Sequence, residues 1–138
     1  MATYNKFRQF VEDLAHQVHN LGSDQLMVAL TNVAPVNTNE VLAELTQISY
    51  TNCSTRNITT TSSTQTGGTY KLTLTDLTLT AGGGTVGAFQ YVVIYNDASV
   101  APADPLIGWY DYASSITLAD GETFLINFDD ANGYLQIA

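Results

Sequence analysis

The chain has 138 residues, a length that fits one domain with a hydrophobic core of its own. Hydrophobic residues make up 45% of the sequence, whereas charged residues make up only 12%, about half the share usual in globular proteins. The net charge is −9 and includes only four Lys and Arg residues, so we expect neither nucleic acid nor an anionic membrane as a partner.

Cysteine content and hydropathy narrow the class of protein further. Cys53 is the only cysteine, which excludes an internal disulfide and a cysteine-rich metal cluster. The first residues lack the apolar run of a signal peptide, and no apolar stretch approaches the ~20 residues that a membrane span needs. We therefore expect a soluble protein made in a reducing cytoplasm.

Residues 4–21 are predicted to form the one helix of the chain, within an N-terminal segment 1–22. Apolar side chains recur there at spacings of three and four, and most charged ones fall on the opposite side. The apolar stripe consists of Phe7, Phe10, Val11, Leu14, Val18 and Leu21. Asn20 and Gly22 follow as a C-terminal stop. We expect this amphipathic helix to pack on its own sheet rather than on a neighbouring molecule.

Strand and turn signals follow one another in the next part of the chain. In residues 24–32 the larger aliphatic side chains Leu26, Val28 and Leu30 occur at every second position, which predicts a strand. Residues 39–45 predict one short helical turn. The β-branched residues of 56–63 favour a strand, and Gly67-Gly68 predicts a hairpin turn. At Asp76 the alternation slips by one position, so we expect either a bulge or two strands that meet there.

The last part of the chain contains the most apolar run. Residues 89–95 are apolar on both faces, which predicts a central strand covered on both sides. A strand over 106–112 follows. Asp120-Gly121 predicts a turn between strands at 116–118 and 123–128, and Asn132-Gly133 predicts a turn before a closing strand at 134–137.

These patterns together predict a mainly-β fold. We expect residues 23–138 to form an antiparallel, jelly-roll-like β-sandwich, with the N-terminal helix packed on one side or end of it. The sequence contains no internal repeat and no linker, so residues 1–138 are expected to form a single domain.

Residues suited to catalysis or metal binding are few. His16 and His19, the only histidines, offer at most two metal ligands, and a packed or exposed helix face explains them better. Cys53 has no neighbouring histidine in the sequence and is expected to be inert. Asp129-Asp130 match a calcium loop only in part and fit a polar hairpin better. We therefore expect no enzyme activity, no cofactor and no metal site.

An aromatic cluster at 109–112 is the strongest candidate for partner contact. On a strand, Trp109 points to one face, while Tyr110 and Tyr112 point to the other. One face is expected to join the core. The other would anchor a protein or a sugar, since Trp and Tyr give a large contact area at a low entropic cost.

Short segments spread over nearly the whole chain form a recognisable pattern. They are Tyr4-Asn5-Lys6-Phe7, Phe10-Val11-Glu12-Asp13-Leu14-Ala15, His19-Asn20-Leu21-Gly22-Ser23-Asp24, Leu30-Thr31-Asn32 with Ala34-Pro35, Gly68-Thr69-Tyr70-Lys71-Leu72, Tyr95-Asn96-Asp97, Pro105-Leu106-Ile107-Gly108-Trp109 and Asp120-Gly121-Glu122-Thr123-Phe124. In these segments the chain resembles a family of small virion structural proteins of tailed bacteriophages. The segments consist of scaffold residues rather than catalytic ones.

The resemblance implies a structural role in the phage particle. The favoured interpretation is a capsid decoration or cement protein, a homotrimer on the outer surface of the head that binds the major capsid protein or another virion protein. A tail, fibre or baseplate component of the same virion is an alternative. An alternative of another class is a carbohydrate-binding β-sandwich that uses Trp109 with Tyr110 or Tyr112.

Overall fold

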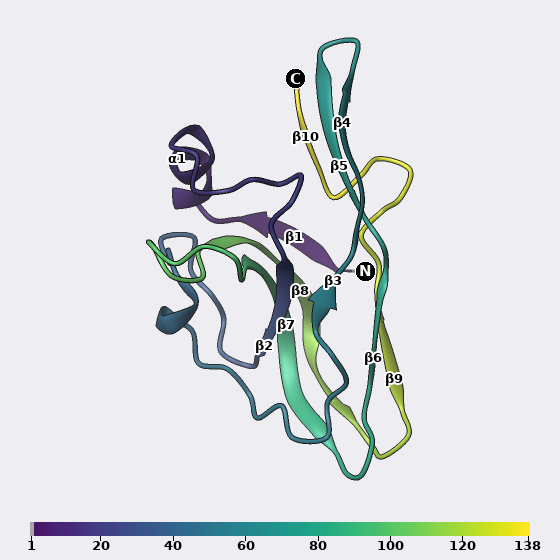
Figure 1. Ribbon diagram of the computed structural model, residues 1–138. Helices are drawn as coiled ribbons and strands as arrows, with labels where there is room; N and C mark the ends of the chain where they lie inside the picture. Colours follow the sequence, from purple (N-terminus) through teal and green to yellow (C-terminus); the bar gives the residue numbers. More distant parts are fainter. Residues whose placement is uncertain (1) are drawn as a thin grey trace.

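The computed structural model describes residues 2–138, and its fold is mainly β with antiparallel sheets, as predicted (Figure 1). The strands are β1 (Thr3–Lys6), β2 (Leu26–Thr31), β3 (Asn57–Ile58), β4 (Thr60–Thr66), β5 (Thr69–Leu74), β6 (Leu77–Thr80), β7 (Val86–Asn96), β8 (Leu106–Leu118), β9 (Thr123–Ile126) and β10 (Leu135–Ile137). The helical segments are α1 (Gln9–Ala15) and the 3-10 turn η1 (Leu42–Glu44). Neither is long and apolar enough to cross a membrane.

The prediction of a helix over residues 4–21 is wrong at both ends. Residues 3–6 instead form β1, which pairs antiparallel with β8, and α1 contains only seven residues. The apolar stripe is divided between two places: Phe7 lies on the outer face of the main sheet, whereas Phe10 and Leu21 lie in the core between the layers. One straight helix cannot reach both places. Pairing with β8 also gives the backbone of residues 3–6 the hydrogen bonds that a first helical turn would lack.

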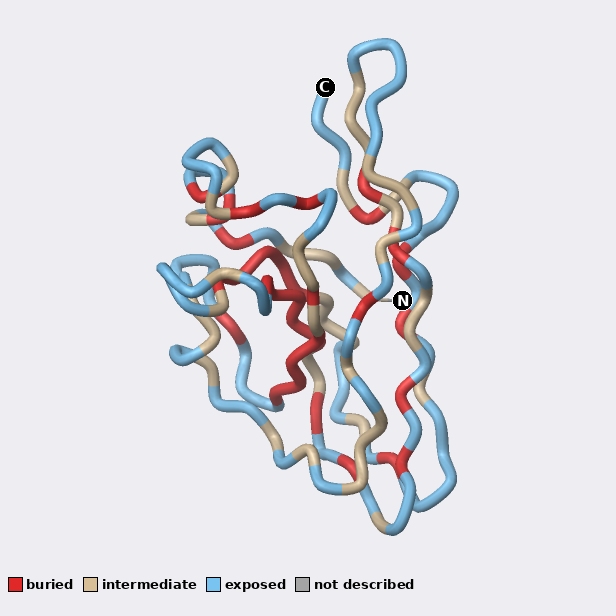
Figure 2. Tube along the Cα trace, in the orientation of Figure 1, coloured by how far each residue is buried: buried red, intermediate tan, exposed pale blue. Residues whose placement is uncertain are grey.

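The first layer is a five-stranded sheet in the order β1-β8-β7-β2-β3. Its centre is β7, as the apolar run 89–95 predicts. The side chains of Val92, Val93 and Ile94 are all fully buried, although they alternate between the two faces of the sheet. The neighbouring strand β2 is also buried on both faces. Figure 2 shows this buried centre.

A single two-stranded ribbon runs through both layers. The β7–β8 ladder extends to the pair Val86 and Leu118, and the β6–β9 ladder resumes at the pair Thr80 and Thr123. Between these pairs the ribbon folds over at residues 81–85 and 119–122 (Figure 1). The predicted turn at Asp120-Gly121 is therefore present, but β9 pairs with β6 rather than with β8. The predicted break at residue 76 is confirmed as the meeting point of β5 and β6.

The second layer consists of the β6–β9 pair and a three-stranded sheet in the order β10-β5-β4. Gly67 and Gly68 form the predicted hairpin turn between β4 and β5, with φ angles of 60° and 88° that favour glycine. This hairpin extends past the rest of the molecule, and its tip is exposed (Figures 1 and 2).

The main core lies between the two layers. The first layer contributes Val28, Leu30, Val92 and Ile94, and the second contributes Leu72, Leu74, Leu79, Ile126 and Phe128. A smaller outer cluster covers the other face of the first layer. It consists of Phe7, Ala29, Val93, Tyr95, Leu106 and Trp109, with Leu42 and Leu45 packed against it from the predicted helical turn. This second cluster explains why β7 is apolar on both faces.

Candidate functional site

The three predicted contact residues lie on β8 and point to opposite faces of the sheet, as the strand alternation requires. Trp109 is only 8% exposed and packs in the outer cluster, 4.5 Å from Phe7 between ring centroids. Tyr110 and Tyr112 face the main core and are half-buried. Little of the Trp109 side chain is therefore accessible to a partner. The two tyrosines remain the candidates for partner contact.

Tyr110 and Tyr112 belong to a cluster of aromatic rings between the layers. Tyr110 packs edge-to-face on Tyr4 at 5.3 Å, and Tyr112 packs edge-to-face on Phe124 at 5.0 Å. The Tyr4 hydroxyl donates a hydrogen bond of 2.9 Å to the Tyr134 hydroxyl. Burial raises the pKa of Tyr4 and of Tyr112 to about 12, so both phenols are neutral over the physiological pH range.

A cleft of about 410 Å³, which we call the tyrosine cleft, opens beside this cluster. Its lining consists of Ala2, Tyr110, Tyr112, Leu125, Asn127 and Asp129. Leu125 is 56% exposed, so an apolar side chain stands in solvent at this surface. The sequence pattern pointed to the two tyrosines but not to the other lining residues, because these come mainly from β9 and the turn after it, which the fold brings up to β8.

The carboxylate of Asp129 shapes one side of the tyrosine cleft. It accepts hydrogen bonds from the backbone and side-chain N–H groups of Asn132, at 3.2 and 2.9 Å. These bonds, the side-chain bond first, hold the pKa of Asp129 below its usual value, so the group is charged. The predicted Asn132-Gly133 turn is present, with a φ of 80° at Gly133. Within residues 2–138, no three His, Cys, Asp or Glu side chains are grouped so that they could hold a metal ion.

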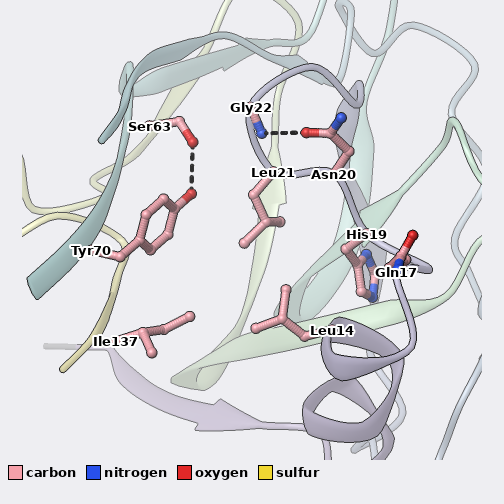
Figure 3. Close-up of a pocket in the computed structure, with 9 residues that line it drawn as sticks. All are labelled: Leu14, Gln17, His19, Asn20, Leu21, Gly22, Ser63, Tyr70 and Ile137. Carbon is pink, nitrogen blue, oxygen red and sulfur yellow. Dashed lines mark hydrogen bonds between the residues drawn. The ribbon is translucent and has the colours of Figure 1, made fainter. Parts of the chain in front are cut away.

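A second cleft, of about 550 Å³, lies between the segment that includes the end of α1 and the sheet β10-β5-β4 (Figure 3). We call it the hairpin cleft. It is lined by Leu14, Gln17, His19, Asn20, Leu21, Gly22, Ser63, Tyr70 and Ile137. The Tyr70 and Ser63 hydroxyls are hydrogen-bonded at 2.7 Å, which fixes the Tyr70 ring on the sheet side (Figure 3). Leu14, Leu21 and Ile137 supply the apolar part of the lining.

The two histidines lie in different environments. His16 is exposed, and its Nδ1 lies 3.7 Å from the Glu12 carboxylate. His19 is only 6% exposed, and its Nδ1 is hydrogen-bonded to the Asn96 side-chain amide at 3.0 Å. Burial lowers the pKa of His19, although Asp13 and Asp24 act in the opposite direction. Its Nε2 and the Asp13 Oδ2 are buried without a hydrogen-bond partner among the residues described.

The single cysteine lies beside a cation but remains an unactivated thiol. Burial raises the pKa of Cys53, and this effect outweighs the nearby Arg56 guanidinium. Arg56 itself donates to the carbonyl of Val28 at 2.6 Å and lies over the Tyr50 ring, 3.6 Å from its centroid. A raised pKa leaves little thiolate at neutral pH, and the thiolate is the reactive form.

Comparisons with known proteins add no relative to this description. No family model, no curated protein and no solved structure matches the chain.

Proposed function

We propose that this chain is a structural protein of a bacteriophage virion, a homotrimeric capsid decoration protein that binds the major capsid protein from outside. The resemblance along the sequence supports the virion assignment. The observation that carries the binding role is the hairpin cleft: the sheet β10-β5-β4 extends past the core and leaves Ile137 exposed beside Leu14 and Leu21. Apolar side chains left in a surface cleft favour a protein partner.

Charge and polarity also support contact with proteins. The hairpin β4–β5 consists mostly of Thr, Ser, Gln and Gly, and Lys71 is its one charged residue. A surface with few charges can be buried against a partner at a small desolvation cost. The net charge of −9 is compatible with a position outside the shell, away from packaged DNA.

The test is electron cryo-microscopy of intact particles from the phage whose genome encodes the chain. Density on the outer head surface, in contact with capsid subunits, is the expected result. Density on the tail alone would replace the capsid assignment with a tail, fibre or baseplate role. Absence of the chain from purified particles would overturn both versions.

Two matched variants test the role of the hairpin cleft in attachment. Ile137→Asp places a charge at the cleft, and we expect it to abolish binding to particles that lack the wild-type chain. Val33→Asp is the control, because Val33 is similarly exposed but lies outside both clefts. Equal binding by the two variants, both with wild-type circular dichroism, would exclude the hairpin cleft as the attachment surface.

A further inference from the structure

The tyrosine cleft contains two phenol hydroxyls that no other described residue engages. No hydrogen bond from another residue of 2–138 reaches the Tyr110 or the Tyr112 hydroxyl, and neither is among the buried polar atoms without a partner. Both hydroxyls therefore reach solvent. The Tyr4 hydroxyl, in contrast, is bonded to Tyr134 inside the cluster. The free groups lie on one strand and line one cleft.

The aromatic rings that line the cleft pack against other rings of the protein. Tyr110 packs against the rings of Tyr4, Phe128 and Tyr134, and Tyr112 packs against Phe124. A sugar would stack on a ring face, and this packing already engages part of both rings within the protein. Its lining also supplies oxygen atoms: two phenol oxygens, the Asp129 carboxylate, and the Asn127 amide oxygen, which already accepts the backbone N–H of Asp129 at 2.8 Å.

Carboxylates outnumber cations around this cleft among the residues that the structure describes. Asp129 and Asp76 both lie close enough to Tyr110 to raise its pKa further, after burial and the neighbouring tyrosines. Asp130 follows Asp129 directly in the chain. Among residues 2–138, the cation next to these groups is Lys71, whose Nζ donates to the carbonyl of Ala131 at 3.2 Å and lies near Asp129. An anionic ligand is therefore disfavoured at this cleft, and a cation is favoured.

We propose that the tyrosine cleft binds a basic side chain of a partner protein, arginine in preference to lysine. A guanidinium group carries five N–H donors in a planar fork, which suits a carboxylate flanked by neutral oxygen acceptors. Leu125, exposed at the cleft, packs on the aliphatic stem of such a side chain. The inference takes from the proposed function only that the partner is a protein, and the site itself does not depend on the virion.

The test is a titration of the isotope-labelled chain with N-acetyl-L-arginine amide, followed by NMR of the tyrosine rings and backbone amides. N-acetyl-L-citrulline amide has nearly the same shape without the charge and serves as the ligand control. We expect saturable shifts at Tyr110, Tyr112 and Asp129 with the arginine compound, weaker at high salt, and none with citrulline.

Two substitutions in the turn separate contact from net charge. Asp129→Asn keeps one side-chain oxygen, which can accept the backbone N–H of Asn132, and suits the left-handed φ of 57° at this position. We expect it to weaken arginine binding about tenfold or more, as for a lost hydrogen bond to a charged group. Asp130→Asn removes the same charge from a residue that does not line the cleft, and is expected to change the affinity by less than about threefold.

Four other outcomes would overturn the proposal that the tyrosine cleft binds arginine. Equal shifts with citrulline would show that charge is not recognised, and shifts with methyl glucoside in place of arginine would assign the cleft to a sugar. Arginine binding that survives Asp129→Asn would place the site elsewhere, and no binding by any probe would leave the cleft without a ligand. Because the titration uses the isolated chain, it can succeed even where the chain proves absent from virions.

Discussion

The side-chain amide of Asn96 joins two segments that are far apart in the sequence. Its Nδ2 donates to His19 Nδ1 at 3.0 Å and to Asp24 Oδ2 at 2.7 Å, while its Oδ1 accepts the backbone N–H of Ala98 at 2.9 Å. The amide orientation is thus set by three bonds. His19 Nδ1 must act as an acceptor, so the proton of the neutral ring lies on Nε2.

This arrangement predicts that the protein loses stability in mild acid through His19. The folded state keeps the ring neutral, because burial lowers its pKa, so below about pH 6.5 the unfolded chain binds more protons than the folded one. The free energy of unfolding is therefore highest above that pH and falls as the pH drops toward the lowered pKa. Urea unfolding at a series of pH values measures this slope.

The matched variants for this pH dependence are His19→Asn and His16→Asn. The asparagine introduced by His19→Asn retains an acceptor for the Asn96 amide but cannot titrate. We therefore expect a lower stability at neutral pH and a flatter profile below about pH 6.5. His16→Asn is the control, because it removes a histidine from an exposed position of the same segment. An unchanged profile in His19→Asn would show that other groups cause the loss.

Gly108→Ala is expected to detach β1 from β8. A Cβ at this position would overlap the Tyr4 hydroxyl and lie 2.8 Å from the carbonyl oxygen of Asn5, so the edge strand would have to move. We expect a loss of about 1–3 kcal/mol in the free energy of unfolding, as for overpacking in a core. Gly82→Ala is the control, since nothing lies within 4 Å of its Cβ position. Similar losses in both variants would contradict the role given to Gly108.

The bond between the Tyr4 and Tyr134 hydroxyls can be measured by a double-mutant cycle. Tyr134→Phe leaves the Tyr4 hydroxyl without its acceptor in a buried cluster, which should cost about 1–3 kcal/mol of stability. Adding Tyr4→Phe removes the orphaned group, so the double variant should recover part of that loss. Chemical denaturation of the four proteins gives the coupling energy. Additive losses would mean that the two hydroxyls are not coupled.

Replacement of Arg56 by lysine is expected to lower the stability of the protein. The guanidinium bonds the carbonyl of Val28 and covers the Tyr50 ring, and a lysine cannot do both with one ammonium group. We expect Arg56→Lys to lower the free energy of unfolding by about 1–2 kcal/mol, measured by chemical denaturation. Lys71→Met is the comparison, because that side chain makes one exposed bond and should change stability by less than about 0.5 kcal/mol.

Local patterns predicted most strands of this protein because each strand carries its own signal. The apolar run 89–95, the glycine pair at 67–68 and the slip at Asp76 each identify a local backbone state, and all three are confirmed. The N-terminal helix was overestimated because Phe7 and Phe10 happen to have helical spacing while they pack in separate clusters. Periodicity describes the spacing of apolar residues along the chain, but it does not identify the cluster in which each residue packs.

The candidate site was only half visible in the sequence. Tyr110 and Tyr112 are neighbours on one predicted strand, but Asp129 fits a polar hairpin and Asn127 falls within the predicted strand 123–128. They reach the tyrosines because β9 pairs with β6 in the second layer, a pairing that no local pattern encodes. The link of His19 to Asn96 is hidden for the same reason, since it spans most of the chain.

The folded ribbon of β6–β9 and β7–β8 also has a consequence for the order of folding. Its innermost pair, Tyr95 and Leu106, closes a short loop, and every later pair along the ribbon joins residues farther apart in the sequence. When strand pairing starts at this loop, it can proceed one pair at a time along the ribbon, and each further pair adds only a small loop-closure entropy. Both layers then form from one nucleus. The spacing between the layers is set by the fold in the ribbon at residues 81–85 and 119–122, and not by two sheets that pack together after each has formed.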